Sequence, residues 1–234
     1  MKKLLLFFFL TAATLVARSQ TYNYNAFGIG GGVSAVYPYV DLNQGKNTFA
    51  FNVTGYYNIS PYLPVGLEFQ TGNISGGSIK DDPNNREFTN NYKAIILHGD
   101  LYLGQIIDYD YSDFKRMIKD FYIGSGVGFI NNNMTYIVRT RPGTDYKFPG
   151  EDKSTNLMVP IRFGYEFRLF NSYGEQFMAV NLGYVHNFTW GEGLDGYADP
   201  SSKFRNNAPD QYRQFVFGVK FNFGPVSSFY KTIN

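Results

Sequence analysis

The chain has 234 residues, of which 44% are hydrophobic, 19% aromatic and only 17% charged, with 25 glycines and no cysteine. The lack of cysteine excludes disulfide scaffolds, thiolate nucleophiles and cysteine-ligated metal sites, and 20 Tyr with 23 Phe make the chain too aromatic for a disordered protein. The formal net charge of +2 includes Lys2, Lys3 and Arg18; without them 18 basic residues face 19 acidic ones, so no nucleic-acid surface is expected.

The first 19 residues are predicted to be an export signal peptide. Lys2 and Lys3 precede an apolar run, residues 4–16, and small residues follow at the spacing that signal peptidase cleaves. A transmembrane helix is the alternative, but thirteen residues span only about 20 Å, less than the roughly 30 Å apolar core of a bilayer. We therefore expect residues 1–19 to be cleaved and residues 20–234 to form one domain.

From about Ala26 onward, eight segments alternate between apolar and polar side chains with a period of two, which predicts β-strands. The first and fifth segments are glycine-rich and therefore show the weakest contrast. The sixth is the clearest, because its odd positions from Leu157 to Leu169 are apolar, whereas Arg162 and Glu166 lie on the opposite face.

The composition of the two faces predicts a membrane barrel. In a soluble barrel, such as a lipocalin-like carrier, the apolar face points inward; in an outer-membrane barrel it meets lipid and the polar face fills the lumen. Here the apolar face carries large side chains that would overfill a small barrel, and the opposite face is rich in Gly, Ser and Asn. Eleven tilted residues rise roughly 26 Å, close to the height of the apolar band. We predict an all-β fold, an eight-stranded antiparallel up-and-down transmembrane β-barrel.

The connections are predicted to alternate between long extracellular loops and short periplasmic turns, as in such barrels. The loops are expected near residues 38–47, 74–91, 131–156 and 191–211, and the turns near 60–64, 108–120 and 171–176. The turn at 108–120 is longer than usual and rich in charge. We interpret it as solvated, with a short helix or a periplasmic contact as the alternatives. The eighth strand is expected to end near Gly224, with no second domain.

Glycine-containing strand motifs carry a resemblance to a known family. The motifs are Phe27-Gly28-Ile29-Gly30-Gly31-Gly32, Pro64-Val65-Gly66-Leu67-Glu68-Phe69, Tyr122-Ile123-Gly124-Ser125-Gly126-Val127-Gly128, Val159-Pro160-Ile161-Arg162-Phe163-Gly164 and Gly218-Val219-Lys220-Phe221-Asn222-Phe223. With them the chain resembles the small eight-stranded outer-membrane proteins of the OmpA transmembrane-domain and OmpX kind, in the version common among Bacteroidota. The resemblance implies a place among outer-membrane lipids. It also implies an assembly signal in Gly218, Phe221 and Phe223, read by the barrel-assembly machinery.

Seven ionisable side chains are predicted to point into the lumen: Glu68, His98, Asp100, Arg162, Glu166, Arg168 and Lys220. Three acids balance three bases, and a low-dielectric interior tolerates charges when they are paired. We interpret the set as a network that plugs the lumen, because eight strands leave just enough room for side chains. A small gated pore or a proton path is the alternative.

A lipid A-modifying enzyme is the rival from another class. A deacylase needs a Ser nucleophile with a His base. His98 and Asp100 lie two residues apart on one face, but no Ser has motif support, and His186, expected on the lipid face near the outer rim, has no deacylase-like run beside it. We predict no catalytic residue, no metal site and no cofactor. The loop acids are interpreted as solvated: Asp81, Asp82, Asp195 and Asp199.

The extracellular loops are the expected place for specific function. They carry aromatic and basic residues: Tyr136, Arg139, Arg141, Tyr146, Lys147, Phe148, Tyr197, Phe204 and Arg205. Such residues are typical of binding surfaces, and a polar covering of the barrel mouth is the equal alternative. The sequence therefore predicts a structural or binding role, with a ligand, a partner or a larger envelope complex contacted through the loops.

Overall fold

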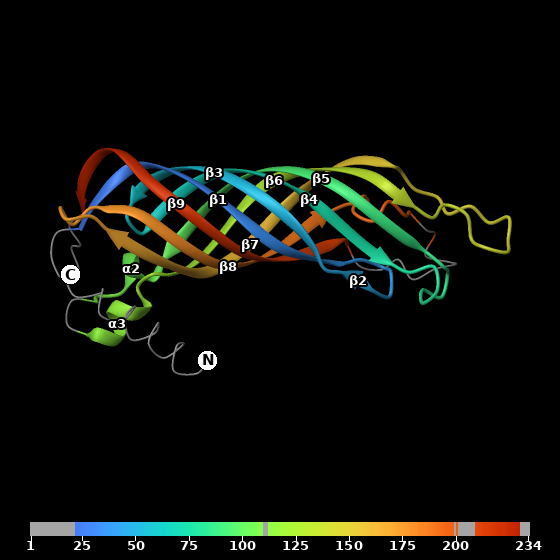
Figure 1. Ribbon diagram of the computed structural model, residues 1–234, viewed down its shortest axis with the longest axis horizontal. Helices are drawn as coiled ribbons and strands as arrows, with labels where there is room; N and C mark the ends of the chain where they lie inside the picture. The colour runs from blue at the N-terminus through green and yellow to red at the C-terminus, as the bar shows by residue number, and fades with distance from the viewer. Residues whose placement is uncertain (1–21, 110–111, 199, 201–208, 230–234) are drawn as a thin grey trace.

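The computed structural model describes residues 22–109, 112–198, 200 and 209–229 (Figure 1). The signal-peptide prediction for residues 1–19 lies outside the described residues. More than half of the chain forms strands: β1 (Tyr22–Tyr39), β2 (Gly45–Lys46), β3 (Thr48–Ser60), β4 (Leu63–Gly77), β5 (Glu87–Tyr102), β6 (Phe121–Ile137), β7 (Lys153–Phe170), β8 (Gln176–Trp190) and β9 (Gln211–Phe229). Two short helices, α2 (Leu103–Ile106) and α3 (Asp113–Ile118), lie between β5 and β6.

The eight long strands close into a barrel. Each pairs antiparallel with its neighbours in the order β4-β3-β1-β9-β8-β7-β6-β5, and the β4–β5 ladder completes the ring. The two-residue strand β2 adds only a short ladder to the end of β4. This arrangement confirms the predicted all-β fold class, an eight-stranded antiparallel up-and-down barrel.

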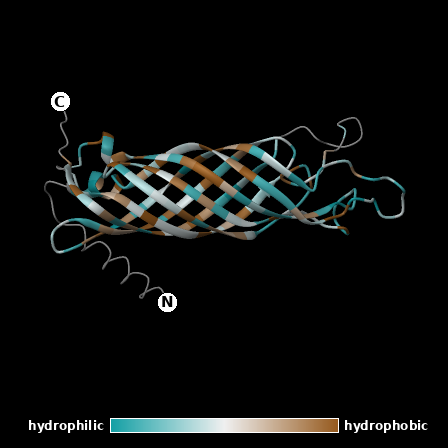
Figure 2. Cartoon of the chain, turned by 90° about the horizontal axis from the view of Figure 1, so that it is seen from above, coloured by the Kyte–Doolittle hydropathy of each residue, from teal (hydrophilic) through white to brown (hydrophobic). Residues whose placement is uncertain are grey.

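The large apolar side chains lie on the outer face of the barrel. Phe163, Phe217 and Phe221 are each 51% exposed, and brown apolar positions alternate with paler ones along the strands of the barrel wall (Figure 2). In contrast, Arg162 is 8% exposed and Lys220 7%. The period of two thus places the aromatic side chains outside and the charged ones inside, as the sizes of the two faces predicted.

The strands extend further than the apolar alternation indicated. β4 and β5 pair out to Gly77 and Glu87, so the loop between them covers residues 78–86 rather than 74–91. Likewise, β9 does not end near Gly224: it runs to Phe229 and pairs with Tyr22 at the start of β1, beyond a register shift after Asn25. The added ladders are rich in Asn, Ser and Gly, which complete backbone hydrogen bonds without leaving an apolar signal in the sequence.

The turn at residues 108–120 contains the short helix that was the alternative to a plain solvated turn, and none of the helix residues is buried. Ser112 caps α3 by accepting the Lys115 N–H. Gly104 N–H of α2 donates to Lys119 O at 2.7 Å, which closes the connection between β5 and β6. Tyr165 Oη on β7 donates to Met117 O at 2.9 Å, which fixes α3 to the barrel. Figure 1 shows α2 and α3 at the barrel end opposite the long loops.

Candidate functional site: the barrel interior and the long-loop mouth

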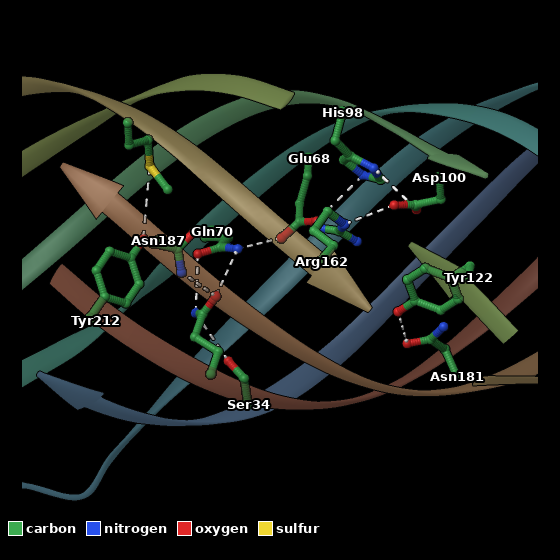
Figure 3. A network of polar contacts seen from close by, with 12 residues as sticks. Ser34, Glu68, Gln70, His98, Asp100, Tyr122, Arg162, Asn181, Asn187 and Tyr212 are labelled. Atoms are coloured by element: carbon green, nitrogen blue, oxygen red, sulfur yellow. Dashed lines mark hydrogen bonds and ion pairs between the residues drawn. The ribbon is translucent and has the colours of Figure 1, made fainter. Parts of the chain in front are cut away.

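Four of the predicted interior residues form one ion cluster (Figure 3). Arg162 on β7 donates from Nη1 to Glu68 Oε2 on β4 at 3.0 Å, and from Nε to Asp100 Oδ1 on β5 at 3.1 Å. His98 lies against the same carboxylates, with Nε2 3.6 Å from Glu68 and Nδ1 3.3 Å from Asp100. Gln70 donates to the second oxygen of Glu68. All four ionisable side chains are buried, and each charge has a partner of opposite sign, as a low-dielectric site requires.

Glycines on the inward face of β6 make room for this cluster. A Cβ on Gly124 would lie 2.0 Å from Asp100 Oδ1, and a Cβ on Gly126 would lie 2.2 Å from Leu97 O. Real Cβ atoms essentially never come that close to another atom, so a side chain at either position would force its surroundings to shift. The Gly-x-Gly spacing that weakens the fifth strand as a sequence signal is therefore what allows the side chains of β5 to enter the interior.

A second ion cluster surrounds Arg168. Its Nε lies 3.3 Å from Glu166 Oε1 and 3.1 Å from Asp120 Oδ1. Tyr102 Oη and Gln176 Nε2 donate to the two oxygens of Glu166, at 2.7 Å and 3.1 Å. Burial raises the pKa of Asp120, and the charge of Arg168 opposes that rise. Sequence reasoning missed Asp120, because it lies at the end of the turn that was interpreted as solvated.

Lys220 makes no direct ion pair with the described residues, although it interacts at longer range with the charge of Glu166. Its Nζ donates to Asn58 Oδ1 at 2.9 Å and lies 4.5 Å from the centre of the Tyr56 ring. A cavity of about 10 Å³ beside it, with Gln176 and Asn222 in its wall, has room for about one water molecule. The seven predicted residues all lie inside the barrel, but they divide into two ion clusters and one cation with neutral contacts.

A buried amide layer lies next to the Arg162 cluster. Gln214 donates from Nε2 to Gln70 Oε1 at 3.2 Å and to Tyr92 Oη at 3.1 Å. It also lies 3.4 Å from Ser34 Oγ, and Asn187 donates to its Oε1 at 3.2 Å. Figure 3 shows how this layer continues from the ion cluster through Gln70. Neutral hydrogen-bonding groups thus follow directly on the charged ones along the interior.

The long loops fold back into the barrel mouth. Phe148, Leu194 and Tyr197 are buried in the same apolar cluster as strand residues such as Phe88. Tyr197 Oη donates to Val138 O at 2.9 Å, which fixes the β8–β9 loop to the end of β6. Phe148 and Tyr197, which the sequence offered as binding residues, serve instead as packing at the mouth.

Two buried carboxyl groups, Asp195 and Asp210, hold the β8–β9 loop. Asp195 Oδ1 accepts the Tyr197 N–H at 2.9 Å, and Asp210 Oδ2 accepts the Leu194 N–H at 3.0 Å. Burial raises the pKa of Asp195 to about 7. Burial also raises the pKa of Asp210 well above its usual range, and the neighbouring charge of Asp195 adds to that rise. Asp195 is therefore a buried hydrogen-bond acceptor and not a solvated loop acid.

An open hollow of about 320 Å³ lies in the long β6–β7 loop. It is lined by Arg139, Lys147, Phe148, Pro149, Gly150 and Asp152. Arg139 is held in place, because Nη2 lies 2.6 Å from Asp152 Oδ1 and Nη1 donates to Gly196 O at 2.6 Å. This hollow contains residues of the kind that the sequence singled out in the outer loops.

The remaining predicted residues fall in several places. Phe221 and Phe223 of the assembly signal are each 51% exposed on the outer face of β9, and Gly218 pairs with Gly32 of β1. His186 lies on the outer face of β8, half-buried among aromatic rings. Phe204, Arg205 and Asp199 lie outside the described residues. Within the described ranges, no group of three or more His, Asp or Glu side chains is placed to hold a metal ion.

Comparison with known proteins finds likeness in architecture only. No family model matches the chain, and no curated protein sequence matches it. Among solved structures, the chain is similar to Neisserial surface protein A, with 11% identity and a TM-score of 0.46 over 85% of this chain and 97% of that one. It is also similar to Ail, the attachment invasion locus protein of Yersinia pestis, solved with the heparin analogue sucrose octasulfate, with 12% identity and a TM-score of 0.43 over 88% of this chain and 100% of that one.

The outer membrane protein OprG of Pseudomonas aeruginosa gives a third match, with 14% identity and a TM-score of 0.40 over 88% of this chain and 100% of that one. No helix in the described part of the chain is both long and apolar enough to cross a membrane. The chain is similar in architecture to small outer-membrane barrels.

Proposed function

We propose that this chain is an outer-membrane β-barrel with a structural or binding role, closed along its lumen and contacting ligands or partners through its long loops. The observation that carries the proposal is the inverted arrangement of the barrel, with exposed aromatic side chains outside and buried ion clusters inside. A surface of this kind is stable where the surroundings are acyl chains. The long-loop end faces the cell exterior, and the turns with α2 and α3 face the periplasm.

Three successive layers support a closed lumen. The ion clusters of Arg162 and Arg168, the amide layer around Gln214 and the apolar cluster at the mouth all contribute buried side chains to the interior. Eight strands leave space for about this many side chains. An ion passing through would have to separate the buried pairs of Arg162, which is costly in a low dielectric.

Single-channel recording in planar bilayers tests the closed lumen. The wild-type chain is expected to show no stable conductance. A Tyr92→Ala/Tyr212→Ala variant, which removes a buried ring pair 5.6 Å apart, is expected to conduct, and Phe215→Ala on the outer face is the matched control that stays silent. Steady wild-type conductance would contradict the proposal and favour the pore.

Location and contacts need separate measurements. The chain is expected in the outer-membrane fraction, with slower gel migration after boiling because the barrel then unfolds. A photo-crosslinking residue at Tyr136, exposed at the long-loop end, is expected to capture an external ligand or partner, and one at Tyr173, 82% exposed at the opposite end, is the comparison. Capture only from Tyr173 would place the contact in the periplasm and contradict the assignment to the loops.

A further inference from the structure

An arginine on the outer wall of the barrel is surrounded by aromatic rings and has no ion-pair partner among the described residues. Arg213 on β9 is paired in register with Tyr37 of β1 on one side and with His186 of β8 on the other. Its guanidinium carbon lies 5.0 Å from the ring centre of Tyr37, 5.5 Å from Tyr39 and 5.8 Å from Phe215. The Arg213 Nε is buried without a hydrogen-bond partner. No acidic side chain of the described residues forms an ion pair with this group.

Arg213 lies at the long-loop end of the row of outward aromatic residues on β9. The outward residues Phe221, Phe217 and Phe215 of β9 are all more than half exposed, and Arg213 is the next outward residue toward the long loops. It therefore lies where the apolar band ends. In the proposed orientation this is the headgroup layer of the outer leaflet, where phosphorylated glycolipids, and not phospholipids, are the main component.

The neighbours of Arg213 add neutral hydrogen-bond donors and a flat apolar wall. His186 Nε2 lies 2.8 Å from Gln211 Oε1, and its Nδ1 lies 3.3 Å from Tyr184 Oη. The side-chain amide nitrogen of Gln211 makes no hydrogen bond with the described residues, so its N–H groups can serve a ligand. The Tyr39 ring stacks on His186 at 5.7 Å and is 41% exposed, so part of it remains open to pack against a sugar ring.

We propose that Arg213, with Gln211, Tyr37 and Tyr39, forms a binding site for a phosphate group on the sugar of an outer-leaflet glycolipid. A guanidinium presents five N–H donors in a planar fork that matches phosphate oxygens. The phosphate supplies the counter-charge that the described residues lack, and the aromatic rings hold the fork in place. This site rests on the proposed outer-membrane location and specifies which lipid the barrel wall recognises.

Lys93 on β5 provides a matched control. It is the outward residue that follows Ile95 toward the long loops, as Arg213 follows Phe215, and Ile95 is 41% exposed. Its register partners are Thr71 and Asn131, so it is a cation at a comparable position without the aromatic surround. General attraction of a cation to anionic headgroups affects both residues equally, whereas a built site affects only Arg213.

Native mass spectrometry of the full chain in detergent, titrated with diphosphoryl lipid A, tests the site. The wild type is expected to retain one lipid A molecule. Arg213→Gln is expected to weaken binding roughly tenfold or more, as loss of hydrogen bonds to a charged group does, and Gln211→Leu by a smaller factor. Lys93→Gln is expected to stay within about twofold of the wild type, and phosphatidylglycerol is expected to bind without dependence on Arg213.

Several results would overturn the site. These are equal losses for Arg213→Gln and Lys93→Gln, unchanged binding in Arg213→Gln, or an equal dependence of phosphatidylglycerol on Arg213. A dimer of the chain that forms in place of the lipid adduct, and is lost in Arg213→Gln, would assign the surface to a second copy. Heat-modifiable migration of each variant shows that the barrel is folded. A chain that fractionates with the outer membrane but shows no selective binding refutes the site alone.

Discussion

Removal of the Arg162 charge is expected to destabilise the barrel severely. Arg162→Met keeps much of the side-chain volume but leaves Glu68 and Asp100, 2% and 4% exposed, with His98 as their shared ionisable neighbour. Breaking a buried pair in this way costs about 3–5 kcal/mol, because a buried charge loses its partner. Here one substitution ends two contacts, at 3.0 and 3.1 Å, so we expect the upper part of that range.

Urea unfolding in detergent or lipid vesicles measures this cost, followed by the fluorescence of Trp190, the single tryptophan, and by heat-modifiable migration. The exposed pair of Arg116 with Asp113, 3.2 Å apart, provides the control, and Arg116→Met is expected to cost less than about 1 kcal/mol.

A triple variant separates the loss of charge balance from the loss of packing. Glu68→Gln/Asp100→Asn/Arg162→Met has no unpaired charge and is expected to regain most of the stability lost in Arg162→Met. The reasoning is refuted if Arg162→Met lies within about 1 kcal/mol of the wild type, or if the triple variant is no more stable than the single one.

Two further predictions use the same folded protein. Gly126→Ala is expected to lower the unfolding free energy by roughly 1–3 kcal/mol through overpacking, because its Cβ would lie 2.2 Å from Leu97 O. Gly99→Ala is the control and is expected to be nearly neutral, because a Cβ there would have nothing within 4 Å. Equal effects of the two substitutions in urea unfolding would contradict the close approach at Gly126. For the β8–β9 loop, the pKa of Asp195 is about 7 in the folded state against 3.8 for the free group, so the folded state binds more protons between those values. The local stability of the loop should therefore fall as pH rises from about 4 to 7, and the neighbouring Asp210, whose pKa is also raised by burial, adds to that fall. Hydrogen exchange of the Leu194 and Tyr197 amides, corrected for intrinsic rates, measures this local stability. Its pH dependence should weaken in Asp195→Asn. Protection that increases between about pH 4 and 7 would show that the buried carboxyl is not the controlling group.

Most of the barrel could be predicted from the alternation of apolar and polar side chains along each strand. The strand period and the side-chain sizes of the two faces were enough to predict which of Phe163 and Arg162 points outward. The ends of the strands were not predictable in this way, because the ladders at Gly77 and Phe229 are built from small and polar residues. Backbone hydrogen bonds between strands depend on register and not on the apolar character of the side chains.

For the candidate sites, too, the sequence predicted some features and the tertiary structure decided the others. Which charged residues face the interior follows from the parity of their position in a strand, and the sequence therefore determined the inward set that includes Glu68, Asp100 and Arg162. Only the tertiary structure decided which of them meet, because the closure of the ring and the stagger of its strands bring β4, β5 and β7 together around one guanidinium. It likewise decided that Asp195 is buried and that Arg213 stands among rings from a strand distant in the sequence. Burial and partnership depend on contacts between segments far apart in the chain, and a pattern within one segment contains no information about them.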